Sequence, residues 1–310
     1  YIITALVALF IVIKKAQFNK LNWNRLFFIM IIKKSFPFAV LVLLMTFYNR
    51  IDSVMIERLL PGKLGDQQAG LYASAYRLLD ASNMIAYLFA VILLPLFARM
   101  LKFKENVEHL TRLSFTLLFI LSITVAMGAY FYRLDIMTLL YPQHINEALE
   151  LYKTRIGETS WIFGILMIGF IPISTTYVFG TLLTANGNLK YLNLVAFSGM
   201  VMNLALNFIL IPKLEATGSA YASLTTQMIM AFIQVLLVVK IFKFQFNFKY
   251  LLLLGIFVIA VYIFNILSQL LPFNWKISFM IMVVLSIITA AVTKLLNIGA
   301  FISILKKGER

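Results

Sequence analysis

The chain is poor in the residues on which most catalytic and metal sites depend. It contains no cysteine and only two histidines, and charged residues make up 13% of its 310 positions. Without cysteine there is neither a disulfide framework nor a thiolate metal site, and the isolated His109 and His144 form no ligand cluster. A phosphate-binding glycine loop and a nucleophile–base pairing are also missing. We therefore expect no enzyme activity, no metal, no cofactor and no ATP-driven pump in this chain.

Apolar residues, by contrast, make up 62% of the sequence, far more than a soluble domain can bury. They form long runs that predict about nine transmembrane helices, because a helix needs about 20 apolar residues to cross a bilayer. The expected spans are 1–13, 35–59, 69–98, 113–132, 159–184, 191–211, 218–239, 250–270 and 276–297. The first run is too short to cross and no charged leader precedes it, so we interpret it as the end of a truncated helix in a longer protein.

The segments between these spans alternate between a basic side and a neutral side. The basic side comprises 14–34, 99–112, 185–190, 240–249 and the tail from Lys294, with 18 cations and three acids. The other side carries seven of each sign. The whole net charge of +15 therefore lies on one side, which the positive-inside rule assigns to the cytoplasm. This pattern predicts a cytoplasmic C-terminus and makes a nucleic-acid partner unnecessary.

Four ionisable residues fall inside the expected spans: Arg50 and Asp52 in the second, and Arg77 and Asp80 in the third. Such residues face the bundle interior or a water-filled cavity, because lipid solvates charge poorly. The position of each arginine along its span predicts a similar depth, in the outer half of the bilayer. In one interpretation, Arg77–Asp80 and Arg50–Asp52 are structural pairs. In the other, at least one arginine lines a central cavity and binds an anionic substrate, because its planar fork matches phosphate.

Helical spacing adds further polar residues to these two spans. In the second span Asn49 lies on the same stripe as Arg50, whereas Asp52 points more than a quarter-turn away. In the third span one face carries a polar and aromatic stripe, made up of Tyr72, Tyr76, Asp80, Asn83 and Tyr87.

Two weaker features occur further along the chain. Asn203 and Asn207 are one turn apart in the sixth span, where they serve either as interhelical hydrogen-bonding residues or as substrate contacts. The run from Pro172 to Tyr177, which includes Thr176, indicates either a proline-broken helix beside a cavity or a plain kink.

Several motifs resemble one known family. They are YNRIDSVM at Tyr48–Met55, QAGLYASAYRLLD at Gln68–Asp80, LPLFAR at Leu94–Arg99, TANG at Thr184–Gly187, MNLALNFILIP at Met202–Pro212 and TGSAYAS at Thr217–Ser223. Together they resemble the Wzx-like polysaccharide or O-antigen flippases of the multidrug/oligosaccharidyl-lipid/polysaccharide (MOP) exporter superfamily.

The resemblance implies an all-α polytopic membrane protein with two six-helix lobes around a central cavity, of which this chain is the C-terminal portion. On that plan, residues 1–34 are the end of a truncated helix and a basic cytoplasmic loop. Residues 35–245 are one six-helix lobe, 246–297 are two additional helices, and 298–310 are a cytoplasmic tail.

The resemblance also implies a function. Members move polyprenyl-diphosphate-linked oligosaccharides, such as O-antigen, capsule or exopolysaccharide repeat units, from the inner to the outer leaflet of the bacterial inner membrane. They do so by alternating access, coupled to an ion gradient. Arg50 and Arg77 would then bind the diphosphate or acidic sugars, and Asp52 and Asp80 would balance charge or couple the ion. The lipid bilayer, the lipid-linked substrate, and glycan polymerases or glycosyltransferases of the same pathway are the implied partners.

Two alternatives stay open at this point. A drug or metabolite exporter of the same superfamily, similar to the MATE transporters, predicts exposed, unpaired carboxylates in the cavity. A non-transporting scaffold for cell-envelope assembly predicts fully paired intramembrane charges and no cavity.

Overall fold

The chain folds into α-helices throughout the described part of a computed structural model, which covers residues 2–15, 24–143, 145, 147–245 and 247–296. His144 and the predicted tail 298–310 lie outside these residues. The helices are α1 (Ile2–Lys15), α2 (Arg25–Leu59), α3 (Gly62–Lys102), α4 (Glu108–Phe131), α5 (Arg133–Leu140), α6 (Leu149–Ile168), α7 (Phe170–Ala185), α8 (Leu189–Phe242), α9 (Phe248–Gln269) and α10 (Trp275–Val292). The predicted all-α class is confirmed.

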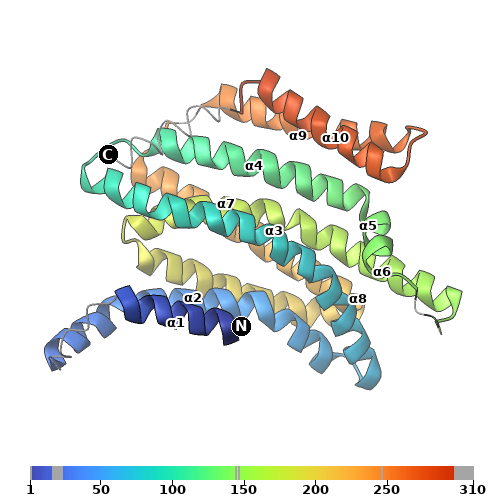
Figure 1. The fold of residues 1–310 in the computed structure, drawn as a ribbon, viewed down its shortest axis with the longest axis horizontal. Helices are drawn as coiled ribbons and strands as arrows, with labels where there is room; N and C mark the ends of the chain where they lie inside the picture. Colours follow the sequence, from blue (N-terminus) through green and yellow to red (C-terminus); the bar gives the residue numbers. More distant parts are fainter. Residues whose placement is uncertain (1, 16–23, 144, 146, 246, 297–310) are drawn as a thin grey trace. The chain divides into compact units, whose positions relative to one another are not determined.

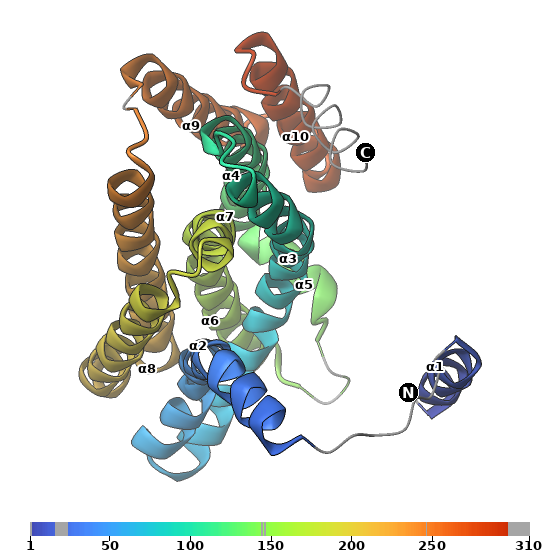
Figure 2. The same ribbon diagram turned by 90° about the vertical axis from the view of Figure 1, so that its left-hand side faces the viewer.

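The chain divides into two compact units, Tyr1–Ala39 and Val40–Arg310, and α2 runs through the boundary between them. In the second unit α7 packs against α3, α4 and α8, and Figure 2 shows it between α3 and α8. The hairpin of α9 and α10 packs on α4, as Figure 1 shows. The large buried side chains of this bundle include Tyr72, Phe163 and Phe170.

Seven helical segments among the described residues are long and apolar enough to cross a membrane, so the chain is a multi-pass membrane protein. One of these segments combines α6 and α7, and another is the 54-residue α8. At 1.5 Å per residue a straight α8 would extend about 80 Å, more than twice the thickness of a bilayer core. It therefore contains both predicted spans, 191–211 and 218–239.

The helix α8 reverses direction at Glu215, whose φ of 54° and ψ of −137° are not helical. Asn207 and Ser223 would lie about 24 Å apart on a straight helix, yet both contact the carboxylate of Asp52. Gly218 makes this turn possible, because a Cβ atom there would come within 2.4 Å of the backbone oxygen of Leu210. Pro212, which has no amide hydrogen to donate, precedes the turn.

The break between α6 and α7 falls at Gly169 and has its cause in Pro172. In a continuous helix the amide of residue 172 would donate to the carbonyl of Ile168, and proline cannot do so. The helix therefore ends at Ile168 and restarts at Phe170. Gly169 itself keeps helical angles, with φ of −60° and ψ of −19°, so of the two alternatives predicted for this run the structure shows the kink, three residues before the proline.

One predicted boundary is wrong. We expected 14–34 to be a basic loop, but α2 begins at Arg25, ten residues before the expected start of the second span. The residues from Leu26 to Ile32 are all apolar and continue the helix without a break, and Lys33 and Lys34 are good helix formers. Two lysines do not end a helix that has apolar residues on both sides.

We predict that Gly218→Ala destabilises the second unit, because the added methyl group must displace backbone rather than a flexible side chain. The expected loss is about 1–3 kcal/mol, the usual range for an overpacked interior. Thermal unfolding of the detergent-solubilised protein measures it. Gly70→Ala is the matched control, since a Cβ atom there meets nothing within 4 Å. An unchanged melting temperature for Gly218→Ala would contradict the tight turn.

Candidate functional site

The most enclosed charge of the described chain is Asp52, whose side chain is only 1% exposed. The hydroxyl of Tyr72 donates to its Oδ2 at 2.6 Å, and the hydroxyl of Ser223 donates to the same oxygen. The side-chain amide of Asn207 donates to Oδ1 at 2.8 Å. No lysine, arginine or histidine forms an ion pair with Asp52 among the described residues. The carboxylate is therefore stabilised by neutral donors alone.

Asp52 and its donors come from three different helices. Asp52 faces the interior from α2, and Tyr72 reaches it from α3. Asn207 comes from the first half of α8 and Ser223 from the second half, so the reversal at Glu215 is what brings both to one carboxylate. Asn203 lies one turn before Asn207 and accepts a hydrogen bond from its amide at 3.1 Å.

Arg50 and Asp80 form the second part of the site and face outward from the second unit. Nη1 of Arg50 lies 3.0 Å from Oδ2 of Asp80, and the two side chains are 63% and 41% exposed. Both structural pairs considered for the sequence, Arg50–Asp52 and Arg77–Asp80, are therefore wrong. The reason is geometric: Asp52 points into the bundle, and Asp80 lies opposite Arg50 on the neighbouring helix.

A stack of two tyrosines lies between the inner and outer parts. The guanidinium of Arg50 is 5.6 Å from the ring centre of Tyr76. The rings of Tyr76 and Tyr72 are stacked with centres 5.8 Å apart, and the Tyr72 hydroxyl donates to Asp52. A series of contacts from Arg50 through Tyr76 and Tyr72 to Asp52 thus connects an exposed cation with a buried acid.

The other predicted residues fall around this core. Arg77 is exposed and has no ion-pair partner among the described residues. The side chain of Asn49 lies outside the described residues. Several polar atoms of the remaining candidates are buried without a hydrogen-bond partner in the described part of the chain: Asn83 Oδ1, Thr176 Oγ1, Asn203 Nδ2 and Asn207 Oδ1. Because buried polar atoms are normally paired, these atoms favour a bound ion, water or ligand nearby.

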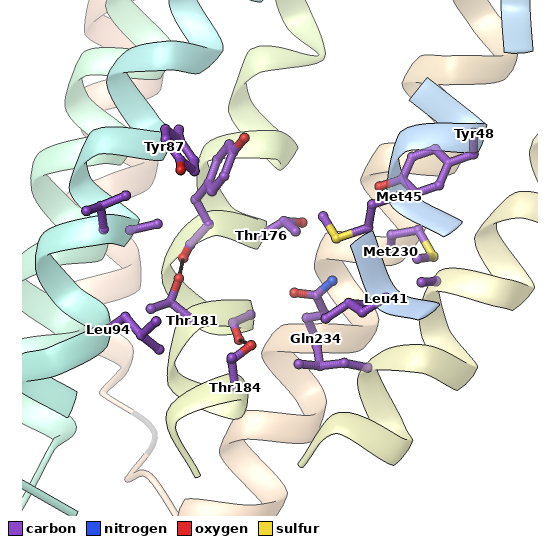
Figure 3. Close-up of a pocket in the computed structure, with 16 residues that line it drawn as sticks. Leu41, Met45, Tyr48, Tyr87, Leu94, Thr176, Thr181, Thr184, Met230 and Gln234 are labelled. Carbon is purple, nitrogen blue, oxygen red and sulfur yellow. Dashed lines mark hydrogen bonds between the residues drawn. The ribbon is translucent and has the colours of Figure 1, made fainter. Parts of the chain in front are cut away.

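A cavity of about 290 Å³ lies on the basic side of Asp52, between α2, α3, α7 and α8. Figure 3 shows Thr176 and Gln234 in its middle, with Tyr87 on one side and Tyr48 on the other. Oε1 of Gln234 is a further buried oxygen without a partner. Gly180 makes room for this oxygen, since a Cβ atom there would lie 2.9 Å from it. The kinked helix α7 therefore borders a cavity, through Thr176 and Tyr177.

Sequence reasoning missed Ser223, Gln234 and Tyr48 as site residues, and also Gln227, which lines a small pocket together with Tyr76 and Ser223. Three of them carried a usable signal: positions 223, 227 and 234 are four and seven residues apart, so they share one face of a helix. Polar residues that recur on one face of an apolar span are typical of a buried polar route. Tyr48 precedes Asp52 by four residues and lies directly above it on α2, but an aromatic residue in a span gives no such signal.

Comparison with known proteins agrees with this architecture. Residues 1–101 match the model of a family described as "Polysaccharide biosynthesis protein". The lipid II flippase MurJ, in an inward closed conformation, superposes with a TM-score of 0.68 at 18% identity over 94% of this chain. A MOP superfamily transporter from Pyrococcus furiosus gives a TM-score of 0.54 at 16% identity over 84%. No curated protein sequence matches the chain.

The chain shares its fold with the MurJ structure and with the MOP superfamily transporter, and the family model described as "Polysaccharide biosynthesis protein" matches its residues 1–101. The resemblance inferred from the sequence motifs is thus confirmed, with the polysaccharide biosynthesis model matching the first third of the chain and the MOP fold extending over nearly all of it. The chain spans 60% of the length of the MurJ structure and 62% of the archaeal one.

We predict that Tyr72→Phe destabilises the second unit by about 1.5–3 kcal/mol, the usual value of a hydrogen bond to a charged group. The change leaves the ring in place and removes only the donor to Asp52. Thermal unfolding in detergent measures it, with Tyr76→Phe as the matched control. Equal stability of the two variants would show that the hydrogen bond to Asp52 contributes nothing.

Proposed function

We propose that the chain is part of a flippase that moves polyprenyl-diphosphate-linked oligosaccharide across the bacterial inner membrane by alternating access, coupled to an ion gradient. The observation that carries the proposal is the exposure of Arg77 inside the candidate membrane span of α3, and of Arg50 on α2, two residues beyond the candidate span Arg25–Tyr48. An arginine exposed at this depth is poorly solvated by lipid and well solvated in a water-filled passage. Such a passage is what a polar head group needs in order to cross.

The chemistry of the exposed groups fits an anionic, sugar-bearing substrate. The guanidinium fork binds two oxygens of a phosphate at once, and Arg77 has no competing acid among the described residues. Asp80 holds Arg50 in place on the same face. The ring of Tyr87, which is 49% exposed, offers a surface on which a sugar ring can stack. The family model named for polysaccharide biosynthesis and the similarity to a lipid II flippase support the same substrate class.

Both alternatives are less well supported by the geometry. A MATE-like exporter of organic cations calls for exposed, unpaired carboxylates, whereas Asp80 is paired with Arg50 and Asp52 is buried. A scaffold calls for complete pairing of charges and no cavity. The exposed Arg77 and the cavity of about 290 Å³ are at odds with that description.

Asp52 is the carboxylate that we assign to ion coupling, and Asp80 the one that we assign to charge balance. A lone buried anion among neutral donors is costly, and taking up a proton or Na⁺ removes that cost. The unpaired Oδ1 of Asn207 would add an oxygen ligand for a metal cation. Because Asp52 joins three helices, cation uptake would change how α2, α3 and α8 pack, and this is how an ion gradient would drive the transport cycle.

We place the basic segments, and with them the C-terminus, in the cytoplasm, on the positive-inside rule. The partners proposed in this setting are the lipid-linked oligosaccharide, the bilayer, and a glycan polymerase or glycosyltransferases of the same pathway.

We predict that the double variant Arg50→Ala, Arg77→Ala loses export of surface glycan, because the proposed passage loses both of its cations for the diphosphate. Translocation of a labelled lipid-linked oligosaccharide in proteoliposomes should fall by at least roughly a hundredfold, on the scale of charged contacts worth about 1.5–3 kcal/mol each. Arg58→Ala with Lys63→Ala removes two cations near the end of α2 and the start of α3 and serves as the control. Normal export by a correctly inserted Arg50, Arg77 variant would remove the site assignment.

We predict that Asp52→Asn abolishes the response of transport to an imposed ion gradient, because the amide has the shape of the acid but cannot take up a cation. Proteoliposomes with a proton or a Na⁺ gradient measure this and distinguish the two ions. Asp80→Asn should keep the response while weakening substrate binding, since Arg50 loses its partner. A gradient response retained by Asp52→Asn and lost in Asp80→Asn would reverse the two assignments.

A further inference from the structure

Two adjoining cavities lie at the basic side of the second unit, away from the transport site. The first, which we call the apolar chamber, has a volume of about 420 Å³ and lies between α4, α7, α8 and α9. Its walls are almost entirely hydrocarbon and aromatic, including Phe115, Phe119, Phe179, Leu254 and Val258. Its size falls in the range of small-molecule binding pockets.

The second cavity, which we call the basic recess, has a volume of about 260 Å³ and lies between the start of α4, the start of α9 and the residues that follow α10. Its lining includes four basic side chains and no acid: His109, Arg112, Lys249 and Lys294. Arg112 is paired with Glu108 at 2.7 Å, whereas Lys249 and Lys294 are exposed and form no ion pair among the described residues. The recess therefore keeps an excess of positive charge.

The two cavities share a wall that is held rigidly. Arg112, Asn247 and Tyr250 line both of them. The Tyr250 hydroxyl lies 2.7 Å from that of Thr116, and the Arg112 guanidinium packs 5.3 Å from the Tyr250 ring centre. The side chain of Asn247 accepts a hydrogen bond from the Tyr250 amide and so fixes the start of α9. A basic, polar mouth thus opens beside an apolar interior.

We propose that these cavities form a binding site for an anionic phospholipid from the leaflet on the basic side, with an acyl chain in the apolar chamber and the phosphate in the basic recess. Charge complementarity selects the head group, since basic pockets between membrane helices bind acidic lipid heads. A soluble phosphate would leave the apolar chamber unfilled, and a neutral lipid would make no use of Lys249 and Lys294.

The site is separate from the one proposed for transport. Neither cavity has a lining residue from α2 or α3, the helices that carry Arg50, Asp52, Arg77 and Asp80. The lipid joins α4 to the hairpin of α9 and α10, so its role is to fasten that hairpin to the six-helix bundle. The proposal does not depend on what the protein transports.

The double variant Lys249→Gln, Lys294→Gln tests binding of the head group in the basic recess. The control is Lys102→Gln with Lys190→Gln, which removes two exposed lysines of the same side that line neither cavity. Native mass spectrometry of the purified protein titrated with phosphatidylglycerol measures binding. The expected loss is roughly thirtyfold for the first variant, from the attraction of two lysines, and little for the second. Equal binding by both variants would overturn the proposal.

The acyl half is tested with Gly255→Leu. A Cβ atom at Gly255 meets nothing within 4 Å and the residue lines the apolar chamber, so leucine fills that space without a clash. We expect weaker binding of phosphatidylglycerol at an unchanged melting temperature, with Gly157→Leu, also free of close neighbours, unaffected. Phosphatidylcholine bound as tightly as phosphatidylglycerol, or phosphatidylglycerol displaced by inorganic phosphate or by polyprenyl phosphate, would each contradict an anionic phospholipid as the occupant.

Discussion

The arrangement of the second unit depends on one constraint: a carboxylate buried in an apolar bundle must have its oxygens satisfied. Asp52 meets this requirement with donors from α3 and from both halves of α8. Removing any one donor would leave a buried anion partly unsatisfied, at a cost well above that of a hydrogen bond lost at the surface. The same residue therefore ties three helices together.

The periodicity of the sequence was sufficient to predict the helices, because a bilayer demands long apolar runs and leaves few other ways to satisfy the backbone. The limits of the prediction have physical causes. The start of α2 was misplaced because Lys33 and Lys34 were taken as a loop signal, although a helix tolerates lysines. The fold-back of α8 agrees with the two separate spans predicted at 191–211 and 218–239, but the sequence alone did not show that the turn lies at Glu215.

The charged residues of the candidate site could be predicted from the sequence, but the ion pair that they form could not. Arg50, Asp52, Arg77 and Asp80 could be found because charge is rare inside spans. Which arginine meets which acid depends on how two helices rotate against each other, and spacing along one helix favoured Arg77–Asp80 over the observed Arg50–Asp80 pair. Ser223 was missed although it shares one helix face with Gln227 and Gln234, and only the reversal of α8 shows that this face meets Asp52.

The stacked rings of Tyr76 and Tyr72 lie between the exposed Arg50–Asp80 pair and the buried Asp52. Substrate bound at Arg50 would compete with Asp80 for the guanidinium and change its position over Tyr76. Tyr76 stacks on Tyr72, and Tyr72 donates to Asp52, so that change would alter the hydrogen bonds available to the buried acid. Conversely, a cation taken up by Asp52 would release Tyr72 and loosen the stack beneath Arg50. Two ligands that bias one shared element are coupled by necessity and to the same extent in both directions. On the proposed function, the contacts through Tyr76 and Tyr72 would therefore couple substrate binding at Arg50 to cation uptake at Asp52.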